Sequence, residues 1–186
     1  MAWYWHRAVP LIRAAGHEAI PVDLPGDDAR AGLNAYADIV VAAIGKRSEV
    51  VLVAQSLAGF TAPLVCARAP VRMLVFVIAM IPKPGETAGA WWGTTGAVHA
   101  REEAAKRHGY STEFDMATYF LHDTPQDVLR SGPDRPREEA DTVFSEHCRF
   151  DHWPDASIHV LARRDDSLFP SRISTAGRVG ETRQGG

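Results

Sequence analysis

The sequence lacks the features that mark several large classes of protein. No apolar run approaches the ~20 residues that a membrane-spanning helix needs, and His6 and Arg7 interrupt the apolar start, unlike in a signal peptide. The net charge is −3 and the basic residues are scattered, so no basic stripe indicates nucleic acid. Cys66 and Cys148 lie far apart, and no metal-ligand spacing occurs. We therefore expect a cytoplasmic protein with free thiols and without a metal, membrane or nucleic-acid partner.

Alternating helix and strand patterns are what the sequence does contain. Residues 3–15, 33–44 and 57–68 have the apolar spacing of helices, and residues 18–22, 50–53, 73–78 and 157–162 have the pattern of strands. The runs 50–53 and 73–78 lack polar alternation, which is typical of strands buried on both faces of a parallel sheet. The sequence therefore predicts one α/β domain whose mostly parallel sheet is flanked by helices.

The pattern changes between residues 83 and 150, which are helical, polar and broken by glycine and proline. This stretch predicts a helical insertion over one edge of a core formed by residues 1–82 and 151–186. Its apolar residues Trp91, Trp92, Met116 and Phe120 indicate either an apolar pocket or simple packing.

Ser56 follows the second aliphatic strand, in the run Ala-Gln-Ser-Leu-Ala-Gly of residues 54–59. A serine hydroxyl becomes a nucleophile when a base takes its proton, and a sharp strand-to-helix turn exposes it. That turn needs small residues two positions before and after the serine, and Ala54 and Ala58 replace the usual glycines. The pattern predicts Ser56 as nucleophile and the backbone N–H of Leu57 as an oxyanion donor. The alternative is that Ser56 caps the helix.

Two aspartates follow the strand at residues 157–162. Asp166 is the favoured acid, because its spacing from Pro170 gives Asp-x-x-x-Pro and because the acid of such a triad holds the tautomer of a histidine. Asp165 or Asp166, or both, could instead cap a helix beginning near Pro170, and both roles are compatible.

A resemblance rests on six segments that occur in a consistent order. They are Trp3-Tyr-Trp-His, Pro10-Leu-Ile-Arg-Ala-Ala-Gly-His17, Val22-Asp-Leu-Pro-Gly26, the Ser56 turn, Ile78-Ala-Met-Ile-Pro82 and Arg164-Asp-Asp-Ser-Leu-Phe-Pro170. Together they resemble the α/β-hydrolase superfamily, in the branch of plant methyl-salicylate-type esterases, hydroxynitrile lyases and bacterial relatives. The resemblance implies Ser56 as nucleophile, Leu57 as oxyanion donor and Asp166 as acid. It also implies a helical lid, a small ester substrate, and neither metal nor organic cofactor.

The chain departs from this resemblance at both ends. The resemblance implies a strand and a second oxyanion donor before the segment that Trp3 begins, and a histidine well beyond the acid. Residues 171–186 contain no histidine. We therefore expect a chain truncated at both ends with impaired activity, and a shifted reading frame is one hypothesis for the tail.

None of the eight histidines is assigned as the base from the sequence. His159 lies in a strand and His147 and His152 precede it. His99, His108 and His122 belong to the helical insertion, where a surface role is favoured over lining a pocket; His6 and His17 flank the first helix. The alternatives to an esterase are a non-catalytic fragment or small-molecule binder and, on the same fold, cyanohydrin cleavage. The oligomeric state stays open.

Overall fold

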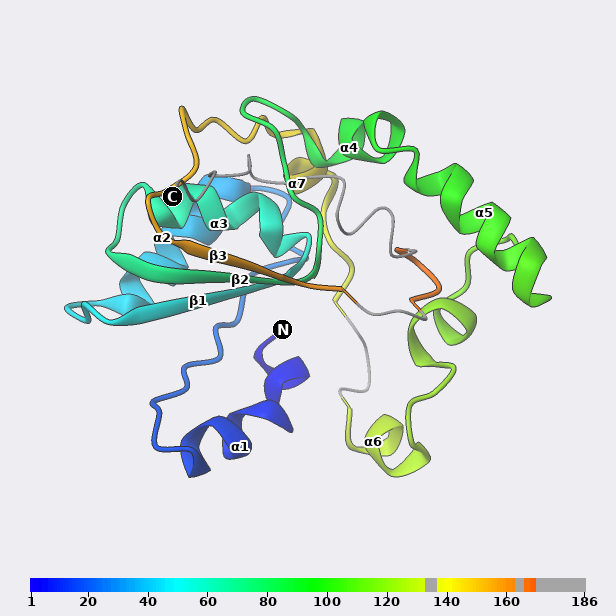
Figure 1. The fold of residues 1–186 in the computed structure, drawn as a ribbon, viewed down its shortest axis with the longest axis horizontal. Helices are drawn as coiled ribbons and strands as arrows, with labels where there is room; N and C mark the ends of the chain where they lie inside the picture. Colours follow the sequence, from blue (N-terminus) through cyan, green and yellow to red (C-terminus); the bar gives the residue numbers. More distant parts are fainter. Residues whose placement is uncertain (133–136, 163–165, 170–186) are drawn as a thin grey trace, which may run out of the picture.

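The computed structural model describes residues 1–132, 137–162 and 166–169 (Figure 1). In chain order, the elements of these residues are η1 (Ala2–Trp5), α1 (Ala8–Ala14), α2 (Leu33–Ile44), β1 (Val50–Ser56), α3 (Ala58–Cys66), β2 (Val71–Ala79), α4 (Ala88–Thr94), α5 (Ala97–His108), η2 (Ala117–Leu121), α6 (Gln126–Ser131), α7 (Asp141–Ser145) and β3 (Ser157–Leu161). η1 is a 3-10 helix, whereas η2 is a π-helix. None of these helices is long and apolar enough to cross a membrane.

Three parallel strands form the sheet, in the order β1-β2-β3. Val53 of β1 pairs with Val75 of β2, which pairs in turn with His159 of β3. The long connection between β2 and β3 contains the helices α4 to α7. The prediction of an α/β fold with a parallel sheet and flanking helices is thus confirmed.

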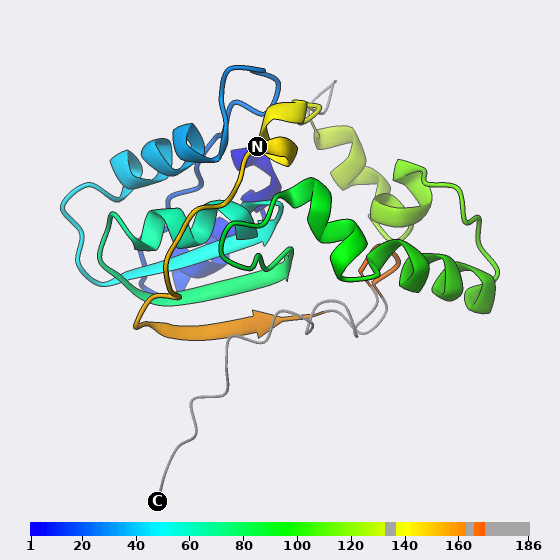
Figure 2. The same ribbon diagram turned by 90° about the horizontal axis from the view of Figure 1, so that it is seen from above.

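Helices α2 and α3 cover one face of the sheet (Figures 1 and 2). Leu33, Tyr36 and Ala37 turn inward from α2, and seven consecutive residues of α3 are buried. Phe60 of α3 and Phe76 of β2 are completely buried, in two adjacent apolar clusters. This face of the sheet therefore holds the core that fixes the end of β1.

The opposite face of β1 is open, so the expectation of a strand buried on both faces is wrong for β1. Val51 and Val53 are 52% and 39% exposed, whereas Ala54 is buried. Successive side chains of a strand point to opposite faces, and among the described residues the helices that pack on β1 cover only one of them.

The start of the chain differs from the predicted single helix and strand. The helix expected over residues 3–15 is divided into η1 and α1, because Pro10 has no N–H to donate to the carbonyl of His6. No residue of α1 is buried, and Leu11, predicted to face inward, is 72% exposed. Residues 18–22, which were predicted to form a strand, are not a strand and pair with no strand among the described residues.

The helices α4, α5 and α6 lie beyond the carboxyl ends of the strands (Figure 1). Glu146, just after α7, ties this region back to the core. One oxygen of its carboxylate accepts the backbone N–H of Leu33 at 2.5 Å, and the other accepts the side-chain amide of Asn34 at 2.6 Å. Glu146 therefore caps the N-terminus of α2 from a distant part of the chain, where a negative charge also complements the helix dipole.

Candidate active site

Ser56 occupies a sharp turn between β1 and α3. Its φ is +52°, in the left-handed region that residues with a side chain rarely adopt. The strand ends at Ser56, and the N-cap of α3 is Leu57, which makes no side-chain cap hydrogen bond. Ser56 is therefore not the helix cap, and the strained turn is the one that the sequence predicts for a nucleophile.

Gly59 allows α3 to pack closely against the end of β2. A Cβ atom at this position would lie 2.1 Å from the carbonyl oxygen of Met80, so only glycine fits. The sequence pattern pointed to Ala58 for this small residue, and the structure places the tight contact one position later. Ala54, two positions before the serine, is buried as expected.

The backbone N–H of Leu57 belongs to the first turn of α3. The first N–H groups of a helix have no partner within the helix, and at the N-terminus they point outward from the helix. Such a group, next to Ser56, is suited to stabilise negative charge on an oxygen of a substrate. The N–H of Leu57 thus lies at the N-terminal end of α3, directly after Ser56.

Asp166 lies in a tight turn after β3, beyond the carboxyl end of the sheet. Its Oδ1 accepts the backbone N–H groups of Leu168 at 2.9 Å and Phe169 at 2.6 Å. These bonds lie within the turn itself, whereas Asp165 and the helix expected near Pro170 fall outside the described residues. These two bonds fix the orientation of the Asp166 carboxylate.

Aromatic packing anchors the turn that carries Asp166. Phe169 is 1% exposed, and its ring lies 5.4 Å from that of Trp91 and 5.3 Å from that of Trp92. The indole N–H of Trp91 donates to the carbonyl of Ile81 at 3.2 Å, which ties α4 to the end of β2. The rings of Trp91 and Trp92 therefore pack against Phe169 and support this turn.

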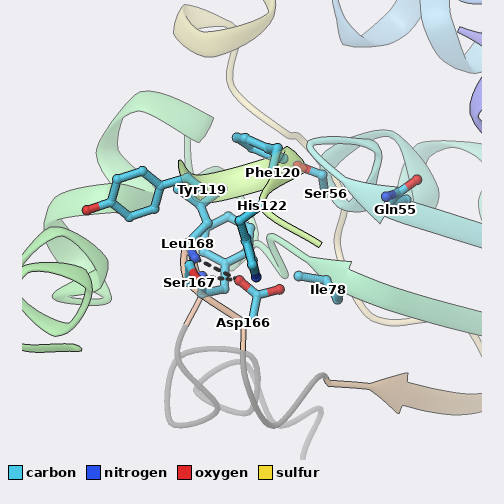
Figure 3. A pocket seen from close by; sticks show the side chains of 10 residues that line it. Gln55, Ser56, Ile78, Tyr119, Phe120, His122, Asp166, Ser167 and Leu168 are labelled. Carbon is cyan, nitrogen blue, oxygen red and sulfur yellow. Dashed lines mark hydrogen bonds between the residues drawn. The ribbon is translucent and has the colours of Figure 1, made fainter. Parts of the chain in front are cut away.

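One pocket, with a volume of about 160 Å³, is lined by Ser56 and Asp166 but not by Leu57 (Figure 3). Its lining consists of Gln55, Ser56, Ile78, Tyr119, Phe120, His122, Asp166, Ser167, Leu168 and Phe169. Ser56 and Asp166 are 110 residues apart in the sequence, and both line this pocket. Phe120 lines the pocket as one reading of the sequence expected, whereas Met116 is 48% exposed and is absent from this lining.

His122 is one of the lining residues that the sequence interpretation missed. A surface role was favoured for it, and the structure places this exposed side chain at the pocket that holds Ser56 and Asp166. The local signal is weak, because a histidine after a short aromatic run has no period or spacing that indicates a site. Ile78 was also missed, although it is the penultimate residue of β2 and lies beside the Ser56 turn, where carboxyl ends of parallel strands converge.

Several of the other histidines have partners elsewhere. A ring nitrogen of His6 lies 2.9 Å from the carbonyl of Trp3, and one of His147 lies 2.7 Å from the carbonyl of Gly85. His159 bonds to the hydroxyl of Ser157 at 2.9 Å. All eight histidines fall within the described residues, and His122 alone is among those lining the pocket.

The thiols and the acidic groups offer little for binding a metal. Burial raises the pKa of Cys66 to about 11 and that of Cys148 to about 12, so both thiols stay protonated at neutral pH. The thiol of Cys148 lies 3.0 Å from the carbonyl of Phe60. Within the described ranges, no group of three or more His, Cys, Asp and Glu residues could hold a metal ion.

Comparison with known proteins gives a family and several relatives. A model of the "Alpha/beta hydrolase family" matches residues 1–183. A protein named probable esterase PIR7A, from Oryza sativa subsp. indica, is 34% identical over 100 residues, which cover 47% of this chain and 38% of that protein. Esterase PIR7B from Oryza sativa subsp. japonica is 34% identical over 101 residues, with the same two shares. The matched region thus spans less than half the length of either rice protein.

Two solved structures share the fold at low sequence identity. An extracellular alpha/beta-hydrolase from a Paenibacillus species superposes with a TM-score of 0.67 at 15% identity, covering 91% of this chain and 75% of that chain. Polyneuridine aldehyde esterase superposes with a TM-score of 0.67 at 17% identity, covering 95% of this chain and 82% of that chain. At these identities the likeness establishes the arrangement of sheet and helices.

Proposed function

This chain is a member of the alpha/beta hydrolase family, and we propose that it is a serine hydrolase that cleaves small carboxylic esters. The observation that carries the proposal is the backbone of Ser56. A non-glycine residue at φ +52°, between a strand and a helix and facing a pocket, presents its hydroxyl to a substrate. The esterase names of the rice relatives support the same reaction class.

In the proposed reaction, Ser56 Oγ attacks the carbonyl carbon of the ester and loses its proton to a base. The backbone N–H of Leu57 stabilises the negative charge that develops on the carbonyl oxygen. The leaving alkoxide takes up the proton, and an acyl-enzyme remains on Ser56. Water then repeats the attack on this acyl group, which releases the carboxylic acid and restores the serine hydroxyl. The carboxylate of Asp166 stabilises the protonated base.

The size and lining of the pocket favour small substrates. A volume of about 160 Å³ is comparable to the ~150 Å³ cavity that accommodates benzene in another protein. Ile78, Phe120 and Leu168 contribute apolar surface, whereas Gln55 and Ser167 contribute polar groups. We therefore expect short acyl chains or a single ring in the acyl group, with esters of long fatty acids being poor substrates.

The helical region between residues 83 and 150 is proposed as a lid of this site. Tyr119, Phe120 and His122 line the pocket from this region, whereas Gln55 and Ser56 line it from the sheet. A lid of this kind limits the access of water and shapes the space for the substrate.

Hydrolysis of p-nitrophenyl acetate tests the proposal. We expect Ser56→Ala to lower kcat by at least about 10³-fold, because the acyl-enzyme can no longer form. Ser48→Ala is the matched control, since Ser48 is an exposed serine that is absent from the pocket lining and should retain full activity. A Ser56→Ala variant that is as active as the unaltered protein would contradict the proposal.

A second candidate is a small-molecule binder without catalysis. Residues 171–186 contain no histidine, so this stretch supplies no base for Ser56. Calorimetric titration with phenyl acetate separates the two candidates. Binding without release of acetate supports the binder, and turnover that depends on Ser56 supports the hydrolase.

A further inference from the structure

The proposed hydrolase needs a base for Ser56, and the pocket supplies one candidate. A serine hydroxyl is a weak nucleophile until a neighbouring group removes its proton. His122 is the histidine that shares the pocket with Ser56 and Asp166. This inference rests on the proposed function: we infer that His122 is the general base of this site.

The helix before His122 explains how the side chain reaches the pocket. Residues 117–121 form the π-helix η2, and His122 is its C-terminal cap. A π-helix is wider than an α-helix and occurs frequently at functional sites. Tyr119 and Phe120, within η2, line the same pocket as His122. The π-helical turn thus brings this short segment to the pocket, with the ring of Tyr119 turned away from His122 (Figure 3).

Tyr119 holds η2 in place from its other side. Its hydroxyl donates to the carbonyl of Ser111 at 2.7 Å, and the guanidinium of Arg101 lies 5.4 Å from the centre of its ring. The rings of Tyr110 and Phe114 each lie 5.6 Å from that of Tyr119. His122 therefore extends from an anchored segment, which is what a catalytic group requires for a defined position.

His122 and Asp166 lie beside each other in the pocket (Figure 3). In Figure 3 the imidazole of His122 extends toward the carboxylate of Asp166, with Ser56 on another wall of the pocket. The two backbone N–H groups on Oδ1 hold this carboxylate in place. The catalytic residues then occur in the order Ser56, His122, Asp166, and such a group is defined by geometry and roles rather than by sequence order.

The proton transfers through His122 balance over the whole reaction. The neutral imidazole accepts the proton of Ser56 Oγ while the bond from Oγ to the carbonyl carbon forms. The imidazolium then gives this proton to the leaving alkoxide as the ester C–O bond breaks. In the second half, the imidazole takes a proton from water and returns it to Oγ when the acyl group leaves.

The rate of labelling by a fluorophosphonate tests this role, because attack by Ser56 on phosphorus needs the same proton transfer. We expect His122→Ala to lower the second-order labelling rate constant by about 10²–10⁴-fold, the range for a general base. Added imidazole should restore part of the rate in His122→Ala, which a purely structural role would not allow. His99→Ala, an exposed histidine on α5, is the matched control and should label at the unaltered rate.

Circular dichroism and the melting temperature establish that each variant is folded. Ser56-dependent labelling that is equally fast in His122→Ala would overturn the role of His122 and leave the proposed function standing. A slow His122→Ala variant that imidazole does not rescue, while His122→Gln labels at the unaltered rate, would also overturn it. Absence of Ser56-dependent labelling in the folded, unaltered protein would overturn both.

Discussion

At the scale of single residues, backbone strain is concentrated beside the pocket. Ser56 and Ile78 are the non-glycine residues with positive φ among those described, at +52° and +47°. The pairing of β1 with β2 shifts between them, because Gln55 pairs with Val77 and Ser56 pairs with Ala79. Ile78 is therefore the extra residue of a bulge opposite the nucleophile. Positive φ is especially costly for a β-branched residue, and strain of this kind clusters at functional sites.

The strain at Ser56 can be measured through stability. Glycine adopts positive φ without a steric penalty, whereas alanine retains the Cβ that causes it. We expect Ser56→Gly to be more stable than Ser56→Ala by about 1 kcal/mol. Urea denaturation of the two variants gives this difference directly. Equal midpoints, or a more stable Ser56→Ala, would show that the turn is unstrained.

The local part of the site could be predicted from the sequence, and the distant part could not. Ser56 and Leu57 belong to a strand-turn-helix whose pattern lies within a few residues, and Asp166 follows a recognisable strand. The positions of His122 and Ile78 depend on how a π-helix packs and on a bulge in strand pairing. Neither feature leaves a periodic signal in the sequence.

At the scale of elements, the packing of α3 against β2 fixes the turn. The carbonyl of Met80 occupies the space that a Cβ atom on Gly59 would need. This carbonyl is part of the backbone and cannot rotate aside as a side chain could. Met80 N–H also donates to the carbonyl of Ser56 at 3.0 Å, so the end of β2 and the nucleophile turn are directly bonded. Displacement of α3 would therefore move Ser56.

Two glycine-to-alanine substitutions test this packing as a pair. Gly59→Ala should destabilise the protein by at least about 1–3 kcal/mol, because the clash with Met80 forces α3 away from β2. Gly93 lies within α4, and a Cβ atom added there would meet no other atom within 4 Å, so Gly93→Ala should be neutral or stabilising by up to about 1 kcal/mol. Thermal unfolding compares them, and a Gly59→Ala variant as stable as Gly93→Ala would contradict the packing account.

Elements with a strong local sequence pattern were predictable. Elements whose length or existence depends on pairing with another strand were not. The helix at 33–44 matches its predicted bounds, and Gly45 ends it at φ +59°. The strands at 50–53 and 73–78 are longer than predicted, because the pairing continues past the aliphatic runs. Residues 18–22 have an apolar pattern like that of a strand, but a strand also requires a neighbour with which to pair.

At the scale of the whole molecule, the buried thiol of Cys148 reports on the integrity of the core. Cys148 is fully buried, and burial holds the pKa of its thiol at about 12, above its ordinary value of 9.0. The folded state therefore favours the protonated thiol. Below pH 9 the thiol is protonated in both states, and above pH 9 the unfolded chain gains by releasing the proton while the folded chain does not.

This difference predicts a loss of stability in alkaline solution. Between about pH 9 and 11, Cys148 should contribute a decrease of up to about 1.4 kcal/mol per pH unit to the free energy of unfolding. Cys148→Ala removes this contribution, so its stability should fall less steeply with pH even if it starts lower. Urea denaturation at several pH values gives both slopes. Parallel slopes for the two proteins would contradict the buried, protonated thiol.

Across the whole molecule, the central claim is that the fold presents Ser56 as an activated nucleophile. The most direct measurement is mass spectrometry of the folded protein after treatment with a fluorophosphonate, followed by mapping of the modified peptide. We predict one adduct per chain, located on Ser56 and absent from Ser56→Ala. A folded protein without an adduct, or with an adduct that persists in Ser56→Ala, would contradict the claim.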